Sequence, residues 1–128
     1  MPPIIVPSPS RYAPVIGFSS AVRAGDWVLV AGMTAIDSSG ECVGGDSAYA
    51  QTREALRKVG VALEGAGSAI SDVVQTRIYL TDVARWEEAG RAHGEVFEGV
   101  RPVATMVGAA ALLDERMLVE VEATAWMG

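Results

Sequence analysis

The chain of 128 residues contains few of the residues on which disulfides and metal sites depend. It has one cysteine, Cys42, so it forms no disulfide within the chain. It has one histidine, His93, and this shortage of His and Cys ligands argues against a metal site. Its longest apolar runs, such as residues 27–32, are too short to cross a bilayer. We therefore expect no disulfide, no metal and no membrane.

Positive charge is also scarce. The chain has ten Lys and Arg residues against 16 Asp and Glu, and a formal net charge of −6. Proteins that bind phosphate backbones need a basic stripe, and the scattered Arg residues and the single Lys58 form none. We therefore do not expect nucleic acid as the main partner. The first residues, MPPIIVPSPSRYAP, lack the basic and apolar regions of a secretory signal, so the expected location is cytoplasmic.

The remaining composition is that of a folded domain. Half of the residues are hydrophobic and 20% are charged, which argues against disorder. The length lies within the usual range for one domain, and folding at this size buries enough surface for a real core. We expect residues 1–128 to form a single domain.

Periodicity predicts alternating strands and helices. Apolar runs at 18–22 and 27–31 flank a turn containing Gly25-Asp26, which favours a hairpin. Asp46 or Ser47 is expected to cap a helix with the apolar stripe Tyr49, Thr52, Leu56, Val59 and Leu63, ended by Gly65 and Gly67. A strand at 73–80 follows, with Val74, Thr76, Ile78 and Leu80 on one side.

A second helix and two strands complete the pattern. Thr81-Asp82 is expected to cap a helix that Gly99 closes, with Trp86, Ala89, His93, Val96 and Phe97 in one stripe. Two strand-like runs flanking a short turn end the chain, and 4–6 suggests an extra strand. The order β-β-α-β-α-β-β predicts an α+β two-layer fold, in which two helices cover one face of a mixed six-stranded sheet.

The last strand places two carboxylates among apolar residues. Because side chains alternate along a strand, Val119 and Val121 should face the helices, whereas Glu120 and Glu122 face away with Trp126. This second face mixes acidic and large apolar groups, which suits a subunit interface with a polar cleft. An ordinary solvated face is the alternative.

Four segments, in order and with matching spacing, resemble the RidA/YjgF family of small trimeric proteins. They are FSSAVRAGDWVLVAGMTAID, AYAQTREALRKVGVALEGAGSAISDVVQTRIYLTD, RPVATMVGAAALL and MLVEVEATAW. The resemblance implies a chorismate-mutase-like fold. It also implies a homotrimer whose sheets line a central β-barrel, with three clefts between subunits.

The resemblance also implies a chemistry. Archetypal members hydrolyse reactive enamines and imines without a metal or an organic cofactor. A glutamate on the last strand, matched here by Glu120, helps to position or activate water. An arginine on the preceding strand holds the substrate carboxylate, but this chain has Ala104 there. Arg101 is a candidate replacement, although in a regular strand it would leave on the face opposite to Ala104.

Other cleft positions of the family also map onto this chain. The resemblance places Phe18 where a tyrosine is common, Gly90 where the archetype has an asparagine, and His93 near the cleft. Thr105, Glu122 and the backbone amides near Gly32 are expected to help Glu120 hold a water and polarise a carbonyl, with Glu120 nearest the chemistry and Glu122 mainly structural. A lone histidine on an apolar helix stripe more often packs than catalyses.

The substitution at Ala104 predicts a ligand different from the archetypal one. Without a cation to offset Glu120, a neutral or cationic small molecule fits better than an imino acid. Three functions stay open: a hydrolase acting on an imine, enamine or related carbonyl compound; a non-catalytic trimer that binds a metabolite; and a translation inhibitor or ribonuclease, against which the acidic balance argues.

Overall fold

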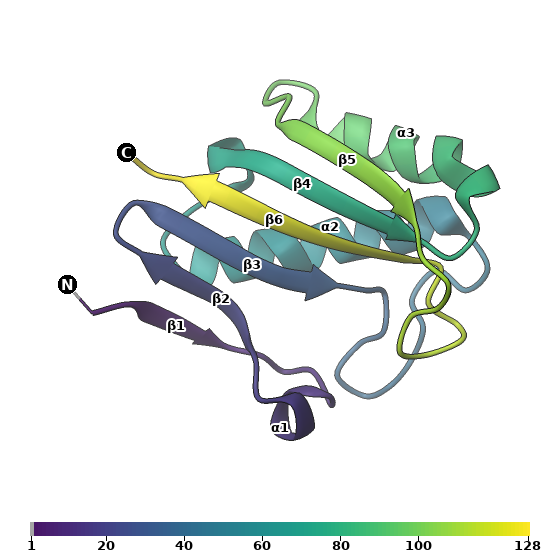
Figure 1. Cartoon of the computed structure of the whole chain (residues 1–128), viewed down its shortest axis with the longest axis horizontal. Helices are drawn as coiled ribbons and strands as arrows, with labels where there is room; N and C mark the ends of the chain where they lie inside the picture. The colour runs from purple at the N-terminus through teal and green to yellow at the C-terminus, as the bar shows by residue number, and fades with distance from the viewer. Residues whose placement is uncertain (1) are drawn as a thin grey trace.

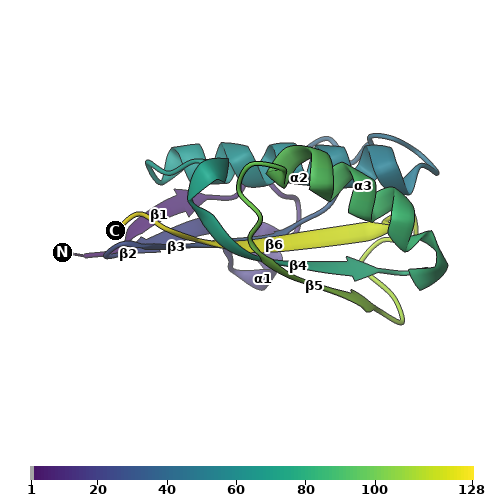
Figure 2. The same cartoon turned by 90° about the horizontal axis from the view of Figure 1, so that it is seen from above.

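The computed structural model describes residues 2–128, which form one six-stranded sheet covered on one face by two helices (Figure 1, Figure 2). The sheet has the strand order β1-β2-β3-β6-β4-β5. The strands are β1 (Ile4–Pro7), β2 (Ser19–Ala24), β3 (Trp27–Met33), β4 (Val73–Leu80), β5 (Val103–Gly108) and β6 (Val119–Trp126). The helices are α1 (Ala13–Ile16), α2 (Ala48–Gly65) and α3 (Trp86–Phe97), with 3-10 turns η1 (Ile70–Asp72) and η2 (Val83–Arg85).

The sheet is mixed, as the sequence predicted. Five strands pair antiparallel with their neighbours, and only β5 lies parallel, alongside β4. The expected short turn between the last two strands is wrong. β6 inserts between β3 and β4, so residues 109–118 carry the chain across the end of β4 instead of turning it back onto β5. β6 is therefore the central strand of the sheet.

The helix-covered face of the sheet forms the core. α2 and α3 pack side by side on this face (Figure 2). Along β6, Val119, Val121, Ala123 and Ala125 are buried beneath the helices. The intervening Glu120 and Glu122 are half-buried on the open face, so the predicted alternation is confirmed.

The capping residues predicted from the sequence mark the start of α2 correctly, but not the start of α3. The Ser47 hydroxyl accepts a hydrogen bond from the amide of Ala50, 3.0 Å away, and so caps α2 as expected. Asp82 instead caps η2, and α3 begins only at Trp86. Trp86 is 54% exposed and does not join the buried stripe, because the 3-10 turn shifts the helical register.

One strand register also differs from the expectation. A bulge at the start of β4 lies between Val73 and Gln75. Val73 therefore faces the core in place of Val74, which is exposed, while Thr76, Ile78 and Leu80 point inward as predicted. A bulge adds one residue to a strand, so the side chains before it point to the opposite faces from those that simple alternation predicts.

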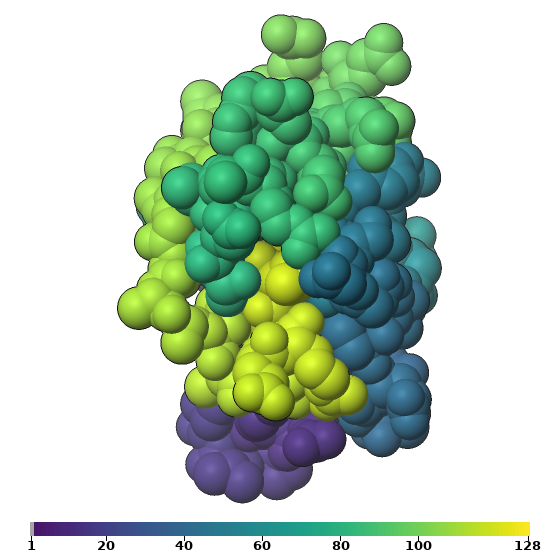
Figure 3. Space-filling model, turned by 90° about the vertical axis from the view of Figure 1, so that its right-hand side faces the viewer, coloured from purple at the N-terminus to yellow at the C-terminus, as the bar shows by residue number. Residues whose placement is uncertain are grey.

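A buried glutamine joins α2 to the segment that leads into β6. The side-chain amide of Gln51 donates hydrogen bonds to the carbonyl oxygens of Gly45 (2.7 Å) and Arg116 (2.9 Å). Its oxygen accepts a bond from the amide of Leu118 at 2.9 Å. Figure 3 shows this end of the molecule, where the loop before α2 (blue) lies against the chain entering β6 (yellow).

We predict that Gln51→Ala lowers the free energy of unfolding by about 2–4 kcal/mol, because it leaves buried backbone groups without partners. Chemical denaturation measures this change. The matched control is Gln75→Ala, which removes an exposed glutamine from β4 and should change stability by less than about 0.5 kcal/mol. Equal effects of the two substitutions would contradict the role given to Gln51.

Candidate functional site

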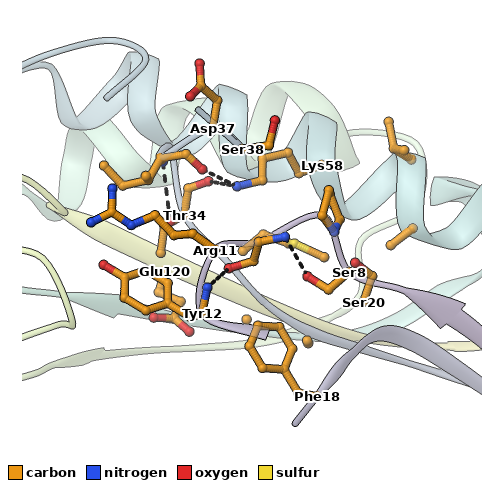
Figure 4. Close-up of a pocket in the computed structure, with 18 of the residues that line it drawn as sticks. Ser8, Arg11, Tyr12, Phe18, Ser20, Thr34, Asp37, Ser38, Lys58 and Glu120 are labelled. Carbon is orange, nitrogen blue, oxygen red and sulfur yellow. Dashed lines mark hydrogen bonds between the residues drawn. The ribbon is translucent and has the colours of Figure 1, made fainter. Parts of the chain in front are cut away.

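A cavity of about 490 Å³ lies at one end of the sheet. The stretch before β2, the ends of β2 and β3, α2 and the start of β6 form its walls (Figure 4). Three residues expected from the sequence, Phe18, Gly32 and Glu120, lie together in its lining. A pocket with a few convergent polar groups is the default candidate for a small-molecule site.

The Glu120 carboxylate rests directly against the backbone of β3. A Cβ atom built on Gly32 would lie only 2.0 Å from Oε2 of Glu120. Here β3 shifts its register relative to β6, between Val30 and Met33. A side chain at position 32 would displace the Glu120 carboxylate, so glycine at this position allows the carboxylate to lie against β3.

The surroundings of Glu120 disfavour its charged form. Burial raises the pKa of this carboxyl, the charge of Glu122 raises it further, and Lys58 opposes both effects. A carboxyl whose pKa moves toward neutrality is a better proton acceptor and donor at physiological pH than an exposed glutamate.

Lys58 is a cavity residue that the sequence did not reveal. It comes from α2, and its ammonium donates hydrogen bonds to the carbonyl oxygens of Thr34 (2.7 Å) and Ile36 (2.8 Å) (Figure 4). Burial lowers the pKa of Lys58, and Glu120 is among the acids that raise it. One sequence signal could have found it. Lys58 follows Ala55 by three residues and precedes Ala62 by four, so it lies on the same side of the helix as these two alanines, which are buried in the core.

Arg11 and Tyr12 are two more cavity residues that the sequence analysis did not predict. They precede α1, in a proline-rich stretch that showed no periodicity, and both line the cavity. The Arg11 guanidinium lies over the Tyr12 ring, with Cζ 5.6 Å from the ring centroid. Two further charged cavity residues pair with each other, since Arg57 binds Glu54 through two hydrogen bonds of 2.8 Å.

The other residues expected in the site lie away from this cavity. Ala104 pairs with Thr76, whose buried side chain faces the helices, so Ala104 faces the same way. His93 on α3 contacts the Thr76 hydroxyl at 2.8 Å, and burial lowers the pKa of its imidazole. Thr105 points to the open face, beside Arg77.

Gly90 and Arg101 are also outside the cavity lining. Gly90 lies on α3, and the atom nearest to a Cβ built there belongs to Trp86, at 3.8 Å. Arg101 precedes β5 and has a left-handed φ of 53°, so the strand alternation used to orient it does not apply. The residues predicted for one cleft thus form two groups, one around Glu120 and one around β5 and α3.

Glu122 has structural partners of its own. Its carboxylate accepts hydrogen bonds from the Tyr79 hydroxyl and from Arg77, the latter at 3.2 Å.

Among residues 2–128, no group of three or more His, Cys, Asp or Glu side chains is arranged to hold a metal ion. Within the same residues, no helix has the length and apolar character needed to span a membrane.

Comparison with known proteins gives the family. The family model described as Endoribonuclease L-PSP matches residues 8–127. The crystal structure of Rv2704 from Mycobacterium tuberculosis, a member of the YjgF/YER057c/UK114 family, superposes with a TM-score of 0.88 and 44% identity, covering 98% of this chain and 99% of that one. The chain belongs to the RidA/YjgF family.

Relatives from two other organisms match most of the length of this chain. The uncharacterised protein SCO2049 of Streptomyces coelicolor is 39% identical over 124 residues, which are 96% of this chain and 91% of SCO2049. The RutC family protein PH0854 of Pyrococcus horikoshii is 32% identical over 114 residues, 88% of this chain and 89% of that protein. The α+β fold expected from the sequence is confirmed, since it is also the fold of the Rv2704 structure.

The raised pKa of Glu120 predicts a pH-dependent effect on stability. The folded protein holds this proton more tightly than the unfolded chain, so ionising Glu120 costs stability that is absent below its ordinary pKa of 4.5 and grows as the pH rises. We expect Glu120→Gln to raise Tm at pH 7, on the order of a few degrees, and to leave it unchanged at pH 4.

Thermal unfolding at pH 4 and pH 7 tests this expectation. Glu115→Gln, at an exposed glutamate before β6, is the matched control and should show no such pH-dependent difference. A Glu120→Gln protein that is less stable than the unmodified protein at pH 7 would show that the ionised carboxylate stabilises the fold.

Proposed function

We propose that the cavity is a small-molecule site in which Glu120 directs water in the hydrolysis of an imine, enamine or related carbonyl compound. The observation that carries this proposal is the half-buried carboxylate of Glu120, which lies in the cavity against Gly32 with a raised pKa. RidA/YjgF membership and the resemblance to imine-hydrolysing members support the same reaction class.

The chemistry required of this glutamate is modest. For an imine, Glu120 accepts a proton from water as the water oxygen bonds to the C=N carbon. Glu120 then gives this proton to nitrogen, which yields a carbinolamine. As the C–N bond breaks, Glu120 accepts the proton of the carbinolamine hydroxyl and passes it to the departing nitrogen, so that a carbonyl compound and ammonia leave and the ionised carboxylate is restored. The positive charge of Lys58 favours the ionised carboxylate that begins this cycle, and burial favours the protonated form that follows it.

A non-catalytic metabolite-binding protein is the second candidate. Ala104 favours it, because the resemblance places the substrate-holding arginine at that position and an alanine offers no charge there. We propose membership of a subgroup without that arginine. A ribonuclease is not favoured, despite the name of the family model, because 16 acidic residues against ten basic ones disfavour RNA binding.

We further propose that the protein is a homotrimer with clefts between its subunits. The open face of the sheet exposes large apolar side chains that a monomer would leave in water, including Trp27 (48% exposed), Leu29 (54%) and Trp126 (47%). The division of the predicted cleft residues into two groups also supports it. In such a trimer, the group around β5 of one subunit would complete the cavity of another.

The proposed reaction predicts a loss of activity with Glu120→Gln. We expect kcat for imines generated in situ from amino acids to fall about 10²- to 10⁴-fold, because the general base is removed. The rate of carbonyl-product formation measures it. Glu115→Gln, which keeps Glu120, should retain the full rate. Undiminished hydrolysis by Glu120→Gln would remove Glu120 from the mechanism, and no hydrolysis by the unmodified protein would favour the binding function.

The proposed trimer predicts a solution mass three times that of the chain. Leu29→Asp should shift this mass toward the monomer, because it places a charge on the apolar open face. Light scattering after size exclusion measures both. Val83→Asp, at an equally exposed valine on η2 outside the cavity lining, should leave the mass unchanged. A monomeric unmodified protein would contradict the trimer.

A further inference from the structure

We propose that Arg11 binds the carboxylate of the small molecule that occupies the Glu120 cavity. This inference rests on the proposed function in taking that cavity as the ligand site, but it does not require that the ligand reacts. It assigns an anion-binding role to a residue outside β5. The ligand class is a small organic molecule with one carboxylate.

Arg11 is the cavity cation that has no partner. Arg57 binds Glu54 through two hydrogen bonds, and Lys58 binds two backbone carbonyls. Among residues 2–128, the Arg11 guanidinium has neither a hydrogen bond nor an ion pair. Arg11 helps Arg116 to lower the pKa of the Asp114 carboxyl, but Asp114 forms its ion pair with Arg116, at 2.8 Å. Both prongs of the guanidinium are therefore free to bind a ligand.

The surroundings of Arg11 hold the free guanidinium in place. Tyr12 provides an aromatic face beneath it, and Nη1 lies where a side chain on Gly40 would be, 2.6 Å from a Cβ built there. Gly40 also adopts a left-handed φ of 91° in the turn after Asp37. These neighbours restrict where the exposed guanidinium can lie, which lowers the freedom it loses on binding a planar anion.

The charges around the cavity permit a carboxylate beside Glu120. Lys58 opposes the negative charge of Glu120, and Arg11 then supplies the positive charge that the ligand requires. A guanidinium matches a carboxylate through two parallel hydrogen bonds, so Arg11 should contribute much more to carboxylates than to their neutral analogues. This reverses the preference for a neutral ligand inferred from Ala104, because the cation comes from another part of the chain.

The decisive experiment measures ligand binding with the full-length protein. The probes are matched pairs of carboxylates and neutral analogues: benzoate with benzamide, and 2-oxobutyrate with 2-butanone. Amide chemical-shift changes report the dissociation constants. We expect the carboxylates to bind at least tenfold more tightly than their partners, and Arg11→Gln to remove this difference while leaving the neutral compounds unchanged within twofold.

Two further variants make the result specific. Arg11→Lys keeps the charge but not the two-pronged geometry, and we expect it to restore only part of the preference. Arg101→Gln tests the arginine that the proposed trimer would bring to the cavity from another subunit, and carboxylate binding that survives this substitution assigns the anion to Arg11. Because Arg11 is exposed and makes no hydrogen bond, Arg11→Gln is expected to fold normally, which thermal unfolding verifies.

The outcomes separate this inference from the proposed hydrolysis. Carboxylate binding that depends on Arg11 without any imine hydrolysis would support the inference and reject the reaction. Hydrolysis lost with Glu120→Gln but with carboxylate dependence unchanged by Arg11→Gln would support the reaction and overturn the inference. Carboxylate binding lost with Arg101→Gln instead, or absent for all probes at 10 mM, would also overturn it.

Discussion

The fold depends on the pairing of β6 with a strand on each side. Without β6, the β1-β2-β3 unit and the β4-β5 pair share no edge, because the sheet order places β6 between β3 and β4. The same strand provides four fully packed apolar residues to the core. Its other face carries Glu120 and Glu122, so the element that closes the sheet also presents both carboxylates.

The candidate site is built from short contacts between elements that are distant in the sequence. Gln51 fixes the chain that enters β6, Gly32 admits the Glu120 carboxylate against β3, and Lys58 ties α2 to the segment after β3. Each contact uses backbone groups, which move little when the fold is intact. The cavity is therefore set by the framework, and its chemistry is set by the few charged side chains that enter it.

Much of this arrangement was predictable from the sequence, and the errors have physical causes. Alternation in β6 placed Glu120 correctly because one face of a central strand is uniformly apolar. The expected turn between β5 and β6 was wrong because adjacency in sequence does not determine which strands pair. Trp86 was misplaced because a 3-10 turn precedes α3 and changes the phase of the apolar stripe.

The cations of the cavity could not be found from local patterns. Lys58 lies at the margin of an amphipathic helix, where lysine is usually solvated, and only the fold brings carbonyl oxygens of residues 34 and 36 to its ammonium. Arg11 lies in a stretch without periodicity, and its place in the cavity depends on the turn around Gly40. Family resemblance directed attention to β5, where the position of interest is occupied by Ala104.

The central position of β6 has a consequence for how the protein is made. A ribosome releases β1 to β5 before β6, so the emerging chain holds two incomplete sheet fragments with open edges at β3 and β4. Most contacts that unite them span long sequence separations, which slows folding. Until β6 pairs with both fragments, the open edges of β3 and β4 are the places where the chain is most exposed to misassociation.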